Sequence, residues 1–414
     1  MPGERGALPF EEWGCGVPGI AAGKEIDMQF VDLKGQYNKI KPEVDAAIAE
    51  VLAGTAFIKG PQVALFEENL SRFTGAKHVI GCANGTDALQ IALMALELQP
   101  GDEVIVPSFT YVASAEVIAL LGLVPVMVDV DARTFNILPE SMERALSPRT
   151  KAIIPVHLYG QCAPMLEVLQ FAKAHNLRVV EDTAQALGAE YLFPDGTKAQ
   201  AGTMGDIGCT SFFPTKNLGA YGDGGALFTN DDALAERIKM IANHGQRVKY
   251  HHSLIGCNSR LDTIQAAILD VKLKYLQDYL KARREAAAFY DKALAETALA
   301  GYIELPYRAP YSTHTFHQYT IIAHPLQRGA DASSAREALK AHLAQAGIPS
   351  MVYYPLPLQE QEAFKGVAKA VGGLENAAGL SASVLSLPMH TELTEPVQSE
   401  VVAACKEFFA KFAL

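Results

Sequence analysis

The segment of this sequence with the clearest chemical potential places a lysine in front of a cluster of glycines. An apolar run over residues 208–213 leads into Lys216, and four glycines follow between positions 219 and 225. That composition predicts a tight loop that can approach a ligand closely. A lysine amine forms an imine with an aldehyde, and burial lowers its pKa so that free amine is available. The alternative is an ordinary solvated loop lysine.

An acidic strand end is the second candidate. The apolar run over residues 177–182 ends in Asp182, and Gln185 follows three residues later. Ligands in open α/β sheets bind beyond the carboxyl ends of the strands, where a carboxylate can pair with a protonated ring nitrogen of a cofactor. Asp is also a preferred helix N-cap, so a purely structural role for Asp182 remains open.

Two further strand ends carry residues suited to a flat, phosphorylated ligand. Gly85, Thr86 and Asp87 lie at the start of a predicted helix, where backbone N–H groups and a hydroxyl can bind phosphate. An ordinary helix cap explains Thr86 or Asp87 equally well. Tyr111 follows the strand predicted over residues 103–107, and its ring can stack on a heterocycle or pack in the core. One sheet edge can gather all these groups into one site.

The pattern of helices and strands that must position these residues predicts an α/β fold. Short apolar runs alternate with amphipathic stretches from residue 87 to about 240, which indicates βαβ units and a mainly parallel sheet. The predicted strands are 103–107, 124–128, 151–156, 177–182, 208–213 and 224–229, with helices over 87–97, 111–121 and 164–175.

The sequence pattern in the second half of the chain predicts a connecting helix and a smaller domain. A helical pattern runs from Asp262 to about Ala295, with a domain boundary near residue 290. A strand over 317–323 and helices over 332–346 and 395–412 then predict a small α+β domain. Residues 1–27 are rich in Gly and Pro and read as an extension outside the fold.

Composition excludes several classes of function. The 414 residues carry a formal net charge of −11, which disfavours binding to nucleic acid or an anionic membrane. No run of 18 apolar residues predicts a transmembrane helix, and the start lacks the features of a signal peptide. Six scattered cysteines form no CxxC pair, so we expect no metal site, no disulfide framework and a reducing cytoplasm.

Longer motifs carry a family resemblance. They are CANGTDALQ, PSFTYVASA, PVHLYGQ, VVEDTAQALGA, TSFFPTKNLGAYGDGGA, NHGQ and NSRLDTIQAAIL. From about Met28 to the C-terminus the chain resembles the DegT/DnrJ/EryC1/StrS sugar-nucleotide aminotransferases. The resemblance implies pyridoxal-phosphate (PLP) fold type I, the aspartate aminotransferase-like fold. Residues 28–290 would form a large domain with a mainly parallel seven-stranded sheet, and residues 291–414 the small C-terminal domain.

The resemblance also assigns roles. Lys216 would form the Schiff base with PLP and move the proton between the substrate carbon and the cofactor. The remaining cofactor contacts would surround it: Asp182 at the ring nitrogen, Gln185 at the ring hydroxyl, Tyr111 on the ring face, and Gly85, Thr86, Asp87, Ser211 and Asn258 at the phosphate. Because Asn258 would come from the partner subunit, a homodimer with shared active sites is implied.

Within the family, the chain is most similar to 3-aminotransferases that act on UDP-2-acetamido-2-deoxy-3-oxo-glucuronate for bacterial O-antigen, with L-glutamate as the expected donor. Arg260 is the candidate partner of the uronate carboxylate, unless it pairs with Asp262. His317 and Tyr319 are further candidates for substrate contacts. Lys59 and the loop at 353–359, which lacks a histidine common in relatives, depart from the family pattern and are expected to shape substrate preference.

Three alternatives stay open at this point. The first is amination of another UDP- or dTDP-linked 3-keto or 4-keto-6-deoxy sugar. The second is a sugar dehydrase, although related dehydrases carry histidine where this chain has Lys216. The third is a non-catalytic homologue that binds sugar nucleotides.

Overall fold

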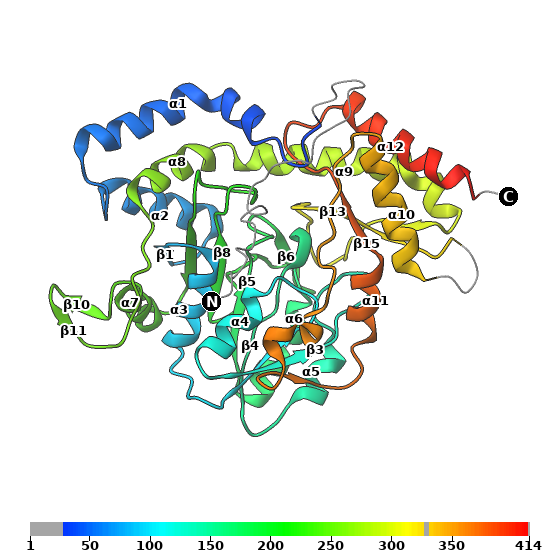
Figure 1. The fold of residues 1–414 in the computed structure, drawn as a ribbon. Helices are drawn as coiled ribbons and strands as arrows, with labels where there is room; N and C mark the ends of the chain where they lie inside the picture. The colour runs from blue at the N-terminus through cyan, green and yellow to red at the C-terminus, as the bar shows by residue number, and fades with distance from the viewer. Residues whose placement is uncertain (1–27, 327–330, 413–414) are drawn as a thin grey trace, which may run out of the picture.

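The computed structural model describes residues 28–326 and 331–412, and the predicted extension over residues 1–27 lies outside them. A large sheet with helices on both faces occupies one part of the molecule, and a smaller sheet with its own helices occupies the other (Figure 1). Among the described helices, none combines the length and apolar character needed to cross a membrane.

The large sheet has eight strands. Their spatial order is β1 (His78–Cys82), β9 (Gly225–Thr229), β8 (Ile207–Ser211), β5 (Arg178–Asp182), β4 (Thr150–Ile153), β2 (Glu103–Pro107), β3 (Val124–Val128) and β14 (Lys369–Ala370). All pairs from β8 to β14 are parallel, while β9 runs antiparallel to both of its neighbours. The predicted mainly parallel sheet is confirmed. Its seven strands from residues 78–229 are joined by β14, an eighth strand from the C-terminal part of the chain.

The sheet is buried on both faces because its strands are continuously apolar. In β2, Val104 and Val106 face the core shared with helices α3 (Gly85–Ala95), α4 (Ala113–Leu120) and α7 (Asp232–Ile241). Ile105 faces the opposite core, which includes α5 (Pro139–Ala145) and α6 (Met165–His175). This period-two alternation places successive side chains on opposite faces of the sheet, whereas the parallel pairing puts the carboxyl ends of β8, β5, β4, β2 and β3 at one edge.

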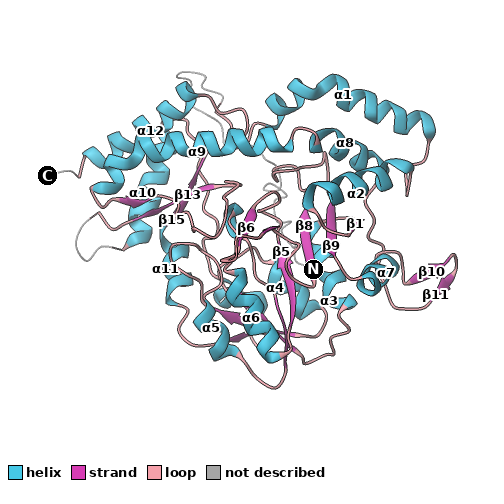
Figure 2. Ribbon diagram, turned by 180° about the vertical axis from the view of Figure 1, so that it is seen from behind, coloured by secondary structure: helices cyan, strands magenta, loops and turns pink. Residues whose placement is uncertain are grey.

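Helices α1 (Leu33–Gly54) and α2 (Pro61–Thr74) pack against α8 (Thr263–Leu273) near the β1 edge (Figure 1). A short hairpin, β10 (Gln246–Val248) and β11 (His251–His252), projects from the body beside α7 in both views (Figures 1 and 2). A second small hairpin comprises β6 (Glu190–Leu192) and β7 (Lys198–Gln200).

The smaller sheet comprises β12 (Ile303–Glu304), β13 (Tyr319–Ala323) and β15 (Val384–Leu387), all antiparallel. Helices α10 (Ala332–Gln345), α11 (Glu375–Ser383) and α12 (Glu395–Ala410) accompany it. Helix α9 (Leu276–Leu299) contributes Leu280 to the core beneath α8 and Tyr290 to the core of the smaller sheet. It therefore bridges both cores, and the domain boundary near residue 290 stays a prediction.

Several predicted elements begin or end up to three residues from their place in the structure; the strand expected over residues 151–156, for example, is β4 and ends at Ile153. Two further differences have a clear physical cause. The single helix expected from Asp262 to Ala295 is two helices, α8 and α9, because Lys274 and Tyr275 form i→i−3 hydrogen bonds that interrupt the α-helical ladder. The strand expected from residue 317 begins at Tyr319, since the carbonyl of His317 is taken by the Arg283 guanidinium rather than by a neighbouring strand.

Candidate active site

The carboxyl ends of β1 and β8 lie on either side of β9, which pairs with both strands. Gly225 of β9 lies opposite both Cys82 of β1 and Ser211 of β8. The turn after β1 packs so closely on β8 that a Cβ on Gly85 would lie 2.6 Å from the Cβ of Ser211. Only glycine fits at position 85, and its backbone lies directly beside the Ser211 side chain.

The first turn of α3 offers hydrogen-bond donors at this place. Asn84 caps the helix and accepts the Asp87 N–H through Oδ1 at 2.8 Å, whereas the Gly85 and Thr86 N–H groups have no intrahelical acceptor. Ser211 Oγ accepts the Phe213 N–H at 3.2 Å and keeps its own proton to donate. Gly85, Thr86 and Ser211 thus form an anion-binding site, whereas the Asp87 N–H is already hydrogen-bonded to the capping residue Asn84.

Asp182 lies at the end of β5 and is only 6% exposed. Ser114 Oγ donates to its Oδ2 at 2.8 Å, and the Ala184 N–H donates to its Oδ1 at 3.1 Å. Residues 184–188 form turns rather than a helix, so the alternative that Asp182 caps a helix is wrong. Two donors orient the carboxylate and leave it acceptor capacity for a ring N–H.

Lys216 lies in the irregular segment that follows β8 and is half-buried. Burial lowers the pKa of its amine from 10.5 to about 8, against the opposing pull of the Asp182 charge. The carboxylate and the amine therefore share one site, as expected for a lysine that must supply free amine near neutral pH. The alternative of a freely solvated loop lysine is wrong.

Gln185 and Tyr111 are joined by a residue that sequence reasoning did not assign to the site. Gln185 is 6% exposed; its Oε1 accepts the Tyr159 N–H at 2.8 Å, and its Nε2 donates to the Tyr354 hydroxyl at 3.0 Å. The Tyr111 ring centroid lies 6.1 Å from that of Tyr354. Tyr111 itself is 56% exposed, so its ring does not pack in the core as the alternative required.

Residues from distant parts of the chain also lie near Lys216. His317 is buried, and burial together with the charges of Lys216 and Arg283 holds its pKa well below the ordinary value. Within the described chain, its Nδ1 has no hydrogen-bond partner. A cavity of about 10 Å³ beside Lys216 is lined in part by Asp32, Arg283 and His390. The fold brings these three residues together from distant segments of the chain.

The remaining residues predicted to bind cofactor or substrate differ in their burial and contacts. Tyr319 is fully buried, and its hydroxyl donates to Asp291 at 2.7 Å, so the side chain is committed to the core and the expected substrate contact has no support. Asn258 is exposed, and Arg260 is partly buried. Arg260 makes no ion pair with Asp262 or with any other carboxylate in the described ranges, so the structural alternative for Arg260 is wrong.

A model of the DegT/DnrJ/EryC1/StrS aminotransferase family matches residues 38–406. The chain belongs to this family. Several curated relatives are named as sugar aminotransferases. The chain is 46% identical to the UDP-2-acetamido-2-deoxy-3-oxo-D-glucuronate aminotransferase of Pseudomonas aeruginosa, over 88% of this chain and 96% of the relative. It is 43% identical to the UDP-N-acetyl-3-dehydro-α-D-glucosamine 3-aminotransferase of Acidithiobacillus ferrooxidans, over 88% and 93%. A Geobacillus stearothermophilus relative, 45% identical over 94% and 100%, is named a pleiotropic regulatory protein.

Solved structures give the same family. An aminotransferase of the family from Brucella abortus superposes with a TM-score of 0.85 at 41% identity, covering 92% of this chain and 99% of the other. NtdA from Bacillus subtilis, solved with the cofactor PMP, superposes with a TM-score of 0.83 at 31% identity, covering 94% and 86%. The chain is thus a PLP-dependent sugar-nucleotide aminotransferase, and its fold is that of the PLP aminotransferases.

The residues of this aminotransferase fit PLP. The cradle at Gly85 and Ser211 suits the phosphate, the buried and doubly hydrogen-bonded Asp182 suits the pyridinium nitrogen, and the Lys216 amine suits the aldehyde. The groups that form this site are nitrogen and oxygen donors and acceptors, which suit an organic phosphate. Among the described residues, no group of three or more His, Cys, Asp or Glu side chains is placed to hold a metal ion.

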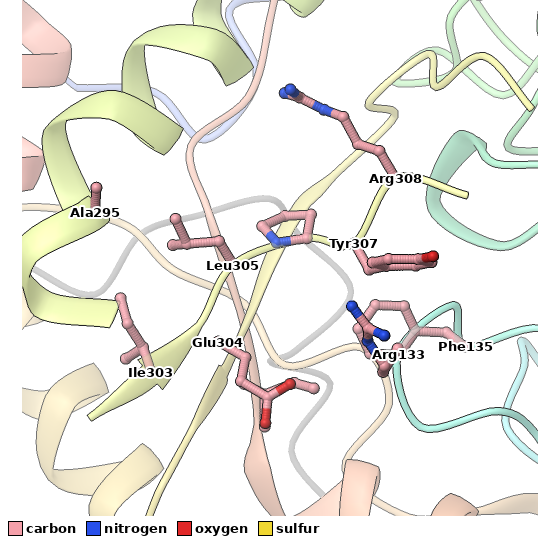
Figure 3. A pocket seen from close by; sticks show the side chains of 10 residues that line it. Arg133, Phe135, Ala295, Ile303, Glu304, Leu305, Tyr307 and Arg308 are labelled. Atoms are coloured by element: carbon pink, nitrogen blue, oxygen red, sulfur yellow. The ribbon is translucent and has the colours of Figure 1, made fainter. Parts of the chain in front are cut away.

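A larger cavity lies away from this site. Its volume is about 550 Å³, and it lies between the turn at Arg133 and Phe135 and the segment from Ile303 to Arg308 (Figure 3). The Arg133 guanidinium carbon lies 3.9 Å from the Tyr307 ring centroid. None of the residues predicted for the cofactor or the substrate lines this cavity. Cavity size alone would therefore have misplaced the active site.

Proposed function

We propose that this aminotransferase moves an amino group from L-glutamate to C3 of UDP-2-acetamido-2-deoxy-3-oxo-glucuronate, in the synthesis of a bacterial O-antigen. The observation that carries the proposal is the Lys216 amine beside Asp182, with the unpaired, partly buried Arg260 as the candidate for the sugar carboxylate. The Pseudomonas aeruginosa relative, whose name specifies this substrate, supports the choice.

Each residue has a defined task in this proposal. PLP, when bound, supplies an electron sink for charge left on the carbon that loses a proton. The Lys216 amine would anchor the cofactor and would then accept and return that proton. Asp182 would hold the protonated ring nitrogen, and Gly85, Thr86 and Ser211 would bind the phosphate. Tyr111 would cover one ring face, and Gln185, which donates to Tyr354, would face the ring hydroxyl.

The overall exchange balances in two halves. Glutamate gives up its amine, takes its new keto oxygen from water and leaves as the corresponding 2-oxo acid. The sugar ketone then takes the amine and loses its oxygen as water, so that no net water is consumed. The buried imidazole of His317 is uncharged in this setting and lies near Lys216, where it can contact the substrate without repelling the cationic amine.

We propose a homodimer in which Asn258 completes the phosphate site of the partner subunit. Asn258 is exposed, and it follows the projecting hairpin whose neighbourhood exposes Val248, Tyr250 and Ile255. Exposed apolar side chains of this kind are typical of an interface. The cytoplasm is the proposed compartment, supported by the free state of all five described cysteines.

The substrate is tested with two keto-sugars that differ in the carboxylate. The wild-type enzyme is expected to prefer the UDP-linked 3-oxo-glucuronate over its neutral 3-dehydro-glucosamine counterpart. The Arg260→Gln variant should lose about 10- to 100-fold in kcat/KM on the uronate, because a charge-assisted hydrogen bond is removed, and should change little on the neutral sugar. Equal rates of the wild type on both sugars would refute the role of Arg260.

A second candidate is amination of the neutral UDP-N-acetyl-3-dehydro-glucosamine, favoured by the Acidithiobacillus ferrooxidans relative. The same pair of substrates decides between the two. Amination of a dTDP-linked keto-sugar is a further arm of that screen. A dehydrase is disfavoured by Lys216 itself, and a non-catalytic homologue by the complete set of cofactor-binding groups.

A further inference from the structure

Lys272 is a buried cation that the chemistry above does not use. It lies in α8, is only 1% exposed, and donates from Nζ to the carbonyl oxygen of Gly219 at 2.5 Å. The same nitrogen lies 5.1 Å from the ring centroid of Tyr221. No carboxylate in the described part of the chain forms an ion pair with it. Burying an ammonium with one carbonyl and one ring as partners is costly, which calls for a compensating role.

The acceptor of Lys272 belongs to the loop that carries Lys216. Residues 212–224 contain no helix or strand, so side chains must fix their path. Gly219 lies three residues after Lys216, and a Cβ at position 219 would lie 2.2 Å from the carbonyl oxygen of Pro214. The loop therefore folds back on itself, so that Pro214 and Gly219, which flank Lys216 in the sequence, lie close together. A shift of Gly219 would move the backbone both before and after Lys216.

Helix α8 holds the same loop at a second point. Gln265 Oε1 accepts the Tyr221 N–H at 2.8 Å, and Gln265 Nε2 donates to the Tyr221 carbonyl oxygen at 3.2 Å. Gln265 and Lys272 are seven residues apart, about two helical turns, and so lie on one face of α8. This face forms a clamp with two contact points on the loop.

The clamp also faces the segment that carries His317. Burial and, to a smaller extent, the Arg283 charge lower the pKa of Lys272 to about 8. Arg283, on α9, donates from Nη1 to the carbonyl oxygens of Phe316 and His317 at 3.1 and 3.2 Å. Two buried cations thus donate to backbone carbonyls of two segments, the loop that carries Lys216 and the segment that carries His317.

We propose that Lys272 is a positioning residue for catalysis: through the Gly219 carbonyl it fixes the loop that aims the Lys216 amine at the cofactor and the substrate carbon.

The test compares Lys272→Met with Lys272→Arg in the holoenzyme and in the cofactor-free protein. Methionine keeps the volume but removes the donor, so kcat should fall about 10- to 100-fold, as expected for a displaced catalytic group, with KM for the sugar within about threefold. The pH midpoint of the cofactor's visible absorbance and the visible circular dichroism should change, and PLP should rebind to the apoenzyme more weakly. Lys272→Arg should restore most of each property.

Arg336→Met is the matched control. Arg336 is also buried and donates from Nη1 to a carbonyl oxygen, that of Ser381, at 3.2 Å, but it lies on α10 and contacts no part of the loop. A similar loss of Tm with an unchanged cofactor spectrum is expected for this variant. The proposal fails if Lys272→Met keeps wild-type kcat and spectra, or if Arg336→Met changes them equally.

Gln265→Ala covers the case in which Lys272→Met does not fold. It removes the second contact of the clamp and should shift the same spectra in the same direction by a smaller amount. Wild-type spectra and kcat in a folded Gln265→Ala protein would then overturn the proposal.

Discussion

Replacing Lys216 by Met should stabilise the cofactor-free enzyme at neutral pH. The structure lowers the pKa of the Lys216 amine from 10.5 to about 8, because burial disfavours its charged form. Below pH 8 the folded protein must carry that disfavoured charge, whereas methionine fills a similar volume without one. A pKa shift of this size corresponds to about 3 kcal/mol in full, and solvent access to the half-buried amine reduces the expected gain to about 1–2 kcal/mol.

The gain has a defined pH dependence. In the wild-type apoenzyme, the folded state releases the Lys216 proton near pH 8 and the unfolded state near pH 10.5. Between these values the unfolded state binds more protons, so wild-type stability rises with pH and the advantage of Lys216→Met shrinks. Lys272 titrates in both proteins and cancels in the difference.

Urea unfolding of the two apoenzymes at equal protein concentration, at pH 7 and at pH 10, measures this difference. A larger free energy of unfolding for Lys216→Met at pH 7 and a smaller difference at pH 10 are expected. The reasoning is refuted if the variant is less stable at pH 7, or if the difference does not change with pH.

Three other variants probe the cofactor contacts. Asp182→Asn should lower kcat by about 100-fold or more, since it removes the charge opposite the ring nitrogen; steady-state kinetics near the wild-type value would contradict this. Ser114→Ala removes one of the two donors to Asp182, and a loss of about tenfold is expected in the same assay. Gly85→Ala should weaken PLP binding by about tenfold or more, because the new Cβ would overlap Ser211; titration of apoenzyme with PLP measures this, and unchanged affinity would argue against the cradle.

The strand-end residues were predictable from sequence because local rules govern them. Continuous apolar runs predict buried parallel strands, and the carboxyl ends of such strands share an edge, so Asp182 and Ser211 fall together once the strands are recognised. The register confirms this, since Asp182 lies opposite Cys209, two residues before Ser211. The turn at Gly85 follows from the same reasoning.

Other parts of the site depend on long-range packing that no local pattern records. Tyr354 reaches Gln185 from a loop 169 positions away in the chain, and Arg283 reaches the Lys216 cavity from a helix. Nor does the sequence show that the hydroxyl of Tyr319, a candidate for a substrate contact, is taken by Asp291 inside the core. The sequence has no Gly or Pro at the break between α8 and α9 that would predict it.

The most direct test of this account identifies the lysine that binds the cofactor. The holoenzyme is reduced with borohydride, which fixes an imine between PLP and a lysine, and the digested protein is analysed by mass spectrometry. The pyridoxyl mass is expected on the peptide that contains Lys216, and Lys216→Ala should carry none. A label on Lys272 or another lysine, or an unlabelled Lys216 in active enzyme, would contradict the assignment of the active site.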